Sequence, residues 1–201
     1  MDALVKILNV LLLSLICSIA QAQEHLVPES SIYSSIQTVR DYHLYVARAF
    51  KKSDSSDVIL KVVSIHSFRP ESALFLKNVD NKYSLVFLNA ESHYWKTHLN
   101  NAPAHPIEKC NISISNQLAL ELERVWLTEL FKARYAADVR QGMDGSTYHF
   151  STPNMAGKTW SPDRNTLMGK LVNLVLELQK MCLTNSDTSK VYSALEMLAV
   201  K

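Results

Sequence analysis

The stretch ALFLKNVDNKYSLVFLN, residues 73–89, contains two apolar runs joined by a short polar segment. The runs cover residues 73–79 and 83–89, and Asp80-Asn81-Lys82 lies between them. Asp and Asn tolerate the left-handed backbone that a tight turn between two strands requires. The stretch therefore predicts an antiparallel β-hairpin, and this hairpin favours a fold built around an antiparallel sheet.

Further strands are expected on both sides of this hairpin. Residues 57–63 are rich in β-branched side chains and are followed by a breaker at residues 69–71, a pattern typical of a strand and a turn. Residues 110–114 alternate between apolar and polar side chains, which predicts a short strand there. Between residues 91 and 106 the pattern breaks down, and we expect an irregular loop.

Three histidines in this loop raise the question of a metal site. His93, His98 and His105 are separated by four and then six residues, a spacing that places no two imidazoles on one face of a helix or strand. Because no cysteine lies nearby, we expect solvated loop histidines and no bound metal.

Four segments carry the periodicity of helices: residues 30–50, 116–135, a long segment after Ser161-Pro162-Asp163, and 188–200. His43 falls in the apolar stripe of the first segment, and we interpret it as a core residue. Glu129 falls in the apolar arc of the second segment and is the best candidate for a buried acid. We expect it to reach solvent or to pair with a Lys or Arg.

A second hairpin is predicted where residues 146–151 alternate after the turn signal Asp144-Gly145. A five-residue connection, 152–156, would place Tyr148 opposite Trp160 and His149 opposite Thr159. This register predicts that Tyr148, Phe150 and Trp160 are buried while the polar side chains face outward. The binding candidates on the outer face are Thr147, His149, Ser151 and Thr159.

The order of these elements predicts the fold class. Strands and helices follow one another without regular βα alternation, and no internal repeat is visible. We therefore expect an α+β fold in which a single antiparallel sheet is packed by several helices, including a long C-terminal helix. Residues 23–201 are expected to form one domain.

The first 22 residues are predicted to be a cleaved signal peptide. Lys6 precedes an apolar run, residues 7–19, that is shorter than the ~20 residues needed to cross a bilayer. Ala20-Gln21-Ala22 then supplies a cleavage pattern, so the mature chain should begin at Gln23 without a transmembrane segment. The alternative, a lipoprotein anchored at Cys17, is disfavoured because Ile16 precedes that cysteine. The expected location is periplasmic in a bacterium and otherwise secreted.

Two cysteines, Cys110 and Cys182, remain after removal of the signal peptide. In an oxidising compartment such a pair favours one disulfide, and the alternative is two buried thiols. Cys182 falls on the apolar side of the long helix, which favours a bridge from that helix to the strand that carries Cys110.

Charge and motifs exclude several classes of function. The chain has 21 Lys and Arg against 19 Asp and Glu, and no basic stripe typical of nucleic-acid binding. It has no glycine-rich phosphate loop, no G-x-S-x-G and no H-E-x-x-H, so no cofactor is expected.

Three hypotheses of function remain open. The first is an exported, non-catalytic module that binds a protein or other macromolecule of the envelope or the secreted space, such as an inhibitor, an immunity-type protein or an assembly factor. The second is a small secreted hydrolase whose site draws on His149 and Ser151 with Glu129 or Asp144 as the acid. The third is a carrier of an apolar ligand between sheet and helices. A cleft that contains His149, an acid and a hydroxyl would favour the second.

Overall fold

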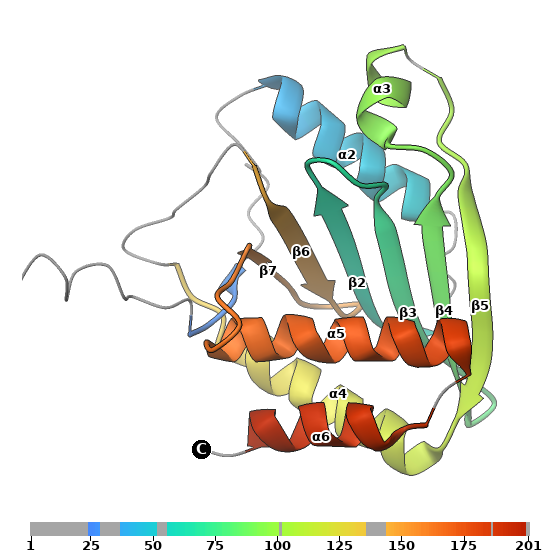
Figure 1. The fold of residues 1–201 in the computed structure, drawn as a ribbon, viewed down its shortest axis with the longest axis vertical. Coiled ribbons are helices and arrows are strands. Elements are labelled where there is room, and N and C mark those ends of the chain that lie inside the picture. The colour runs from blue at the N-terminus through green and yellow to red at the C-terminus, as the bar shows by residue number, and fades with distance from the viewer. Residues whose placement is uncertain are drawn as a thin grey trace, which may run out of the picture.

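The computed structural model describes residues 24–28, 37–51, 56–100, 102–135, 144–185 and 187–199, and the predicted signal peptide lies outside this part of the chain. The described strands form one seven-stranded antiparallel sheet in the order β1-β7-β6-β2-β3-β4-β5 (Figure 1). The predicted α+β class is therefore confirmed. The strands are β1 (Val27–Pro28), β2 (Val58–His66), β3 (Ser72–Val79), β4 (Lys82–Ala90), β5 (Pro106–Ile114), β6 (Ser146–Ser151) and β7 (Ala156–Trp160).

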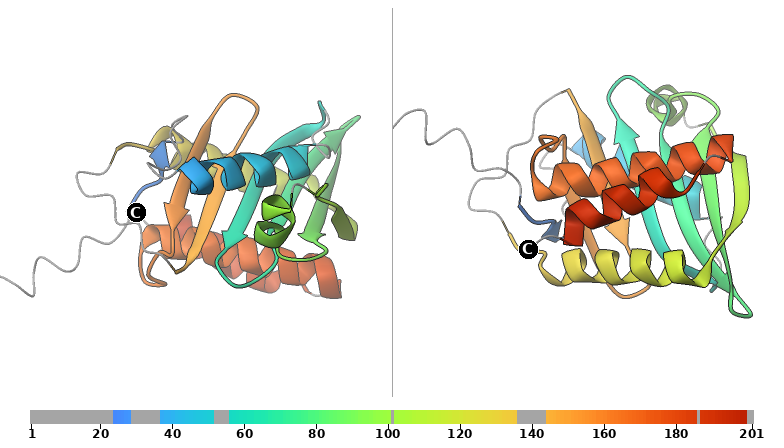
Figure 2. Two further views of the ribbon diagram at one scale, coloured as in Figure 1. Left: turned by 90° about the horizontal axis from the view of Figure 1, so that it is seen from above. Right: turned by 60° about the horizontal axis from the view of Figure 1, so that its bottom comes forward.

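Helices cover both faces of the sheet (Figure 2). Helices α2 (Gln37–Lys51) and α3 (Tyr94–Leu99) lie on one face. Helices α4 (Asn116–Phe131), α5 (Leu167–Thr184) and α6 (Ser189–Ala199) lie on the other. The sheet therefore separates two apolar cores, a large one beneath α4, α5 and α6 and a smaller one beneath α2 and α3. The predicted long helix is α5, with 18 residues, and it is followed by the shorter α6, with 11.

The hairpin predicted from residues 73–89 is confirmed as β3 and β4. Val79 pairs with Lys82, so only Asp80 and Asn81 form the turn. Their φ angles are 50° and 62°, the left-handed values that a tight two-residue hairpin requires at both positions. Alternate residues of both strands then enter the two cores, and no free face remains along the centre of the hairpin.

Helix α4 begins at the predicted cap, where the Ser115 hydroxyl accepts a hydrogen bond of 3.2 Å from the Leu118 N–H. The central part of its predicted apolar arc is buried, whereas Leu120 and Phe131 are exposed. Glu129 is buried, and its Oε1 lies 2.9 Å from Nζ of Lys132. The predicted pairing of this acid with a basic side chain is therefore confirmed.

Two local predictions were wrong. The expected loop at 91–106 contains α3, which His93 caps by accepting a hydrogen bond from the Trp95 N–H, and the following strand β5 begins at Pro106 rather than at Cys110. The long helix does not begin at Ser161-Pro162-Asp163. It begins at Leu167, because the hydroxyl of Thr166 accepts a hydrogen bond from the Gly169 N–H and acts as the cap.

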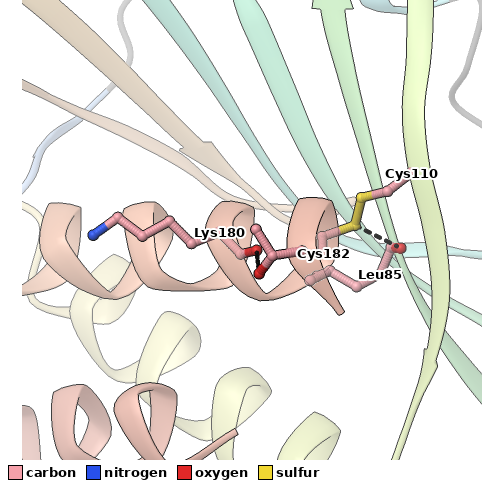
Figure 3. The surroundings of a disulfide bond; sticks show 5 residues. Leu85, Cys110, Lys180 and Cys182 are labelled. Atoms are coloured by element: carbon pink, nitrogen blue, oxygen red, sulfur yellow. Dashed lines mark hydrogen bonds between the residues drawn. A yellow bond between two sulfur atoms is a disulfide. The ribbon is translucent and has the colours of Figure 1, made fainter. Parts of the chain in front are cut away.

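Cys110 and Cys182 form a disulfide, as predicted, and their Cα atoms are 5.8 Å apart (Figure 3). Cys182 lies in the buried stripe of α5, and its sulfur is 3.6 Å from the carbonyl oxygen of Leu85 on β4. The bridge spans 72 residues of sequence and attaches β5, the last strand of the sheet, to the helix that covers the large core.

None of the helices in the described parts of the chain has the length and apolar character needed to cross a bilayer.

Candidate functional site

The register of the β6–β7 hairpin decides where the predicted site residues lie. Ser151 pairs with Ala156, so the connection has four residues, 152–155, instead of the five expected. The partners on β7 consequently shift by one position. Tyr148 lies opposite Thr159, and His149 lies opposite Lys158.

This shift corrects the predicted faces. Tyr148 and Phe150 are buried in the large core as expected, but Thr159 is buried on their side of the sheet and Trp160 is only half-buried. His149 does lie on the opposite face from Tyr148, yet that face is covered by α2, and the side chain is only 8% exposed. The predicted outer patch of Thr147, His149 and Thr159 is therefore not formed.

His149 instead belongs to a cleft between the sheet and α2. Its floor consists of two neighbouring cross-strand pairs, Lys61 opposite Ser151 and Val63 opposite His149, with Ile65 beyond them. Directly opposite residues of an antiparallel pair point to the same face with their Cβ atoms about 5 Å apart. The pairing of β2 with β6 therefore brings an ammonium, a hydroxyl and an imidazole to one surface.

The other wall of the cleft is α2, which contributes His43 and Ala47, one helical turn apart. The His43 ring stands edge-on to the His149 ring, with 5.5 Å between their centroids. The enclosed volume is about 140 Å³. Ala47 is exposed and Lys61 and Ser151 are half-buried, so the cleft opens to solvent beside these residues.

Four polar side chains line the cleft. Lys61, His43, His149 and Ser151 line it together with three apolar residues, and no Asp or Glu of the described chain is part of the lining. Lys158, opposite His149 on β7, adds a second ammonium-bearing side chain to this face of the sheet.

A second polar cluster lies beside the cleft, around the fully buried carboxylate of Glu71. The Tyr42 hydroxyl donates to its Oε1, and the Tyr94 N–H donates to its Oε2 at 2.8 Å. Burial, followed by the hydrogen bond to Glu71, raises the pKa of Tyr42 well above its usual range, so this phenol keeps its proton. Glu71 therefore joins β3, α2 and α3 through groups that act as donors.

His93 contacts this cluster but is held in a structural role. Its Nε2 lies 3.0 Å from the carbonyl oxygen of His66, and its Nδ1 accepts from the Trp95 N–H at 3.1 Å. Its Nδ1 also lies 3.4 Å from Oε1 of the Glu71 carboxylate.

His66, at the end of β2, has a pKa that is unusually low for a histidine. Burial of the ring lowers its pKa to about 4, and the charges of Arg69 and His93 act in the same direction. Its Nδ1 lies 2.7 Å from the Ser146 hydroxyl. The ring is therefore neutral at physiological pH and serves as a hydrogen-bonding link between β2 and β6.

The structure brings together only part of the predicted site. His149 and Ser151 share the cleft, Thr147 lies on the same face of β6 outside the lining, and Thr159 lies across the sheet. Neither predicted acid reaches the cleft, because Glu129 lies on α4 beneath the other face and Asp144 is exposed ahead of β6. His43 and Lys61 were missed as site residues, although the apolar stripe around His43 correctly indicates that α2 packs on the sheet.

The described residues contain no group of three or more His, Cys, Asp and Glu side chains that could hold a metal ion. Comparisons with known protein families, with curated proteins and with solved structures find no match for this chain.

Proposed function

We propose that this chain is an exported, non-catalytic module that binds another protein of the envelope or the secreted space through the edge of β5. The observation that carries the proposal is the free edge itself. Strand β5 has nine residues and ends the sheet, and among the described residues its partner is β4 alone. An unpaired strand edge offers a row of N–H and C=O groups to which an extended segment can add.

The two halves of β5 differ in how open they are to such a partner. The first half begins with Pro106 and carries Glu108 and Lys109 at a bulge in its pairing with β4, features that oppose strand addition. The second half, Cys110 to Ile114, pairs regularly. The disulfide holds this half against α5, so its edge is fixed in position before any partner arrives.

The side chains of this half predict the chemistry of the partner. Asn111 and Ser113 are exposed on one face, and Ile112 and Ile114 are half-buried against the large core on the other. A strand that adds here should place polar residues beside Asn111 and Ser113 and apolar residues beside the two isoleucines. The disulfide also supports the proposed location, since such bonds persist in oxidising compartments outside the cytosol.

The alternative, a secreted hydrolase, is supported by one observation: His149 and Ser151 line the same cleft. A histidine that activates a hydroxyl is oriented by a third group, usually an acid. The described lining supplies Lys61 and no carboxylate, so we place this hypothesis second.

The experiment is photo-cross-linking in the producing cell with a reactive amino acid at position 113, followed by binding measurements on the captured partner. The matched control position is Asn154, which is exposed in the β6–β7 connection. We expect cross-links at 113 and none at 154. Lysines placed on the edge by Asn111→Lys with Ser113→Lys should weaken the purified complex at least ~10-fold, whereas Asn154→Lys should leave the affinity unchanged.

Equal cross-linking at both positions, or a complex that tolerates the edge lysines, would overturn the proposal. Turnover of ester or amide substrates that disappears in His149→Ala would favour the hydrolase instead.

A further inference from the structure

We infer that Asn111 is an acceptor site for an N-linked oligosaccharide, attached while the chain passes through a secretory compartment that holds the transfer machinery. Asn111, Ile112 and Ser113 form the sequence Asn-x-Ser, in which the middle residue is not proline. This sequence occurs once in the chain. The predicted signal peptide and the disulfide between Cys110 and Cys182 both favour a route through an oxidising compartment, where this modification is made.

The structure presents both side chains that the modification requires. Asn111 and Ser113 are exposed and lie two residues apart on β5, so they share one face of the strand. Ile112, between them, packs against the large core on the other face. Neither polar side chain belongs to a core, so a glycan on Asn111 leaves both cores intact.

The surface beside the acceptor sequence is polar. The partner of Ser113 on β4 is Ser84, and the partner of Ser84 on β3 is Lys77. Both partners are half-buried, and neither belongs to the smaller core under α2 and α3. A hydrophilic glycan therefore meets groups that form hydrogen bonds there, and no exposed apolar patch.

The order of the chain keeps the acceptor sequence accessible while the protein is made. Cys110 directly precedes Asn111, but its partner Cys182 comes 72 residues later. The bridge that holds β5 on α5 cannot form until that later part of the chain has entered the same compartment. Transfer of a glycan to Asn111 can therefore precede closure of the disulfide.

The co-substrate is an oligosaccharide carried on a polyprenyl diphosphate, and the reaction is a group transfer without oxidation. A bond forms between Nδ2 of Asn111 and C1 of the first sugar, and the bond between C1 and the diphosphate breaks. The amide gives up one proton, and the polyprenyl diphosphate leaves. Ser113 supplies the hydroxyl by which the transferase recognises the acceptor.

This inference goes beyond the proposed function and does not rest on it. Strand side chains stand roughly perpendicular to the sheet, whereas strand addition uses the main-chain groups along its edge. A glycan on Asn111 therefore extends from the face of β5 and leaves the main-chain groups of the edge in place. A chain that lacks the glycan would overturn this inference and leave the edge proposal standing.

The test is intact-mass analysis of the full chain, secreted from a eukaryotic cell line by its own signal peptide. The native chain should carry one glycan, and an amidase that removes N-linked glycans should return it to the mass of the polypeptide. This amidase converts a glycosylated Asn to Asp. Cleavage in heavy-oxygen water should therefore leave labelled Asp at position 111 alone, where peptide mapping detects it.

Three variants make the assignment specific. Ser113→Ala should lose the glycan although Asn111 is retained, whereas Ser113→Thr keeps the hydroxyl and should carry the glycan. The matched control is Asn116→Gln. Asn116 is exposed at the start of α4 and is not followed by the required hydroxyl, so this variant should be glycosylated as the native chain is.

The inference is overturned if the native chain leaves the cell at the mass of the polypeptide, if Ser113→Ala keeps the glycan, or if Asn116→Gln loses it. If the native signal peptide does not direct export, translation into microsomes with a standard cleavable signal peptide in place of residues 1–22 decides the matter. A chain that enters the microsomes without gaining a glycan overturns the inference, and one that gains it at Asn111 supports it. Peptide mapping of the native chain remains decisive even if a variant fails to fold.

Discussion

At the scale of single residues, Glu71 stabilises the packing of α2 and α3 on the sheet through buried hydrogen bonds. The carboxylate has no exposed surface and receives donors from Tyr42 and from the backbone of Tyr94. Glu71→Ala should lower the free energy of unfolding by about 2 to 5 kcal/mol, because two buried donors lose their acceptor. Chemical denaturation measures this loss.

The matched variants for this prediction are Glu71→Gln and Glu91→Ala. The amide oxygen of Gln can still accept a hydrogen bond, so Glu71→Gln should be milder than Glu71→Ala. Glu91 is exposed close to the same helix, and its removal should change stability by no more than ~0.5 kcal/mol. A loss at Glu91→Ala as large as that at Glu71→Ala would show that the buried contacts are not the cause.

His66 makes stability depend on pH. The pKa of His66 is about 4 in the folded protein, below the ordinary value of 6.5. Between pH 6.5 and 4 the ring is therefore protonated in the unfolded chain but stays neutral in the folded protein. The stability is fully present above about pH 6.5 and is lost as the pH falls toward 4. The expected loss is about 2 kcal/mol, less than the whole shift implies because the ring is partly exposed. Denaturation of His66→Gln from pH 4 to 7 should show a correspondingly flatter profile.

The burial of Glu71 could not be predicted from the sequence around it. It follows Arg69-Pro70, and the three residues together are typical of an exposed turn. Its partners Tyr42 and Tyr94 come from positions 29 residues earlier and 23 residues later. No local pattern encodes such an encounter, because it depends on how α2 and α3 pack on the sheet.

At the scale of elements, the register of the β6–β7 hairpin gives Phe150 and Trp160 different burial, although strand alternation predicts that both are buried. Phe150 is fully buried and its ring lies 5.3 Å from that of Trp126 on α4, whereas Trp160 is only half-buried. Phe150→Ala should cost about 3 to 5 kcal/mol, and Trp160→Ala should cost less, about 1 to 2 kcal/mol. Thermal or urea unfolding of the two variants gives the order, and a larger loss at Trp160→Ala would contradict the register.

The alternation of β6 was predictable, because a strand repeats every two residues whatever surrounds it. Tyr148 and Phe150 consequently enter the large core as expected. The length of the connection was not predictable from the same pattern, and a change of one residue replaces Trp160 by Thr159 on the buried side. The cleft was missed for a related reason: alternation separates two faces, but it does not say that α2 covers the second one.

At the scale of the whole molecule, the disulfide connects the last strand to the helix over the large core. Closing 72 residues of chain restricts the unfolded state by about 4 kcal/mol in the loop-entropy model, an upper figure. Reduction, or Cys110→Ser with Cys182→Ser, should lower the free energy of unfolding by up to that amount. Denaturation with and without reductant measures it. In the double variant reductant should have no effect, and a remaining effect would point to a different cause.

The sheet order sets a sequence of events during folding. Strands β2 to β5 are consecutive in the chain and can pair as they are made, but β2 also needs β6, and Ser146 comes 80 residues after its partner His66. Until the β6–β7 hairpin has formed and paired with β2, the edge of β2 that will lie inside the sheet has no partner strand. Pulse-labelled hydrogen exchange should therefore find β3 and β4 protected before β6. A nascent chain that stalls before residue 146 presents β2 to its neighbours, which makes late synthesis the moment when this protein is most exposed to aggregation and most in need of a chaperone.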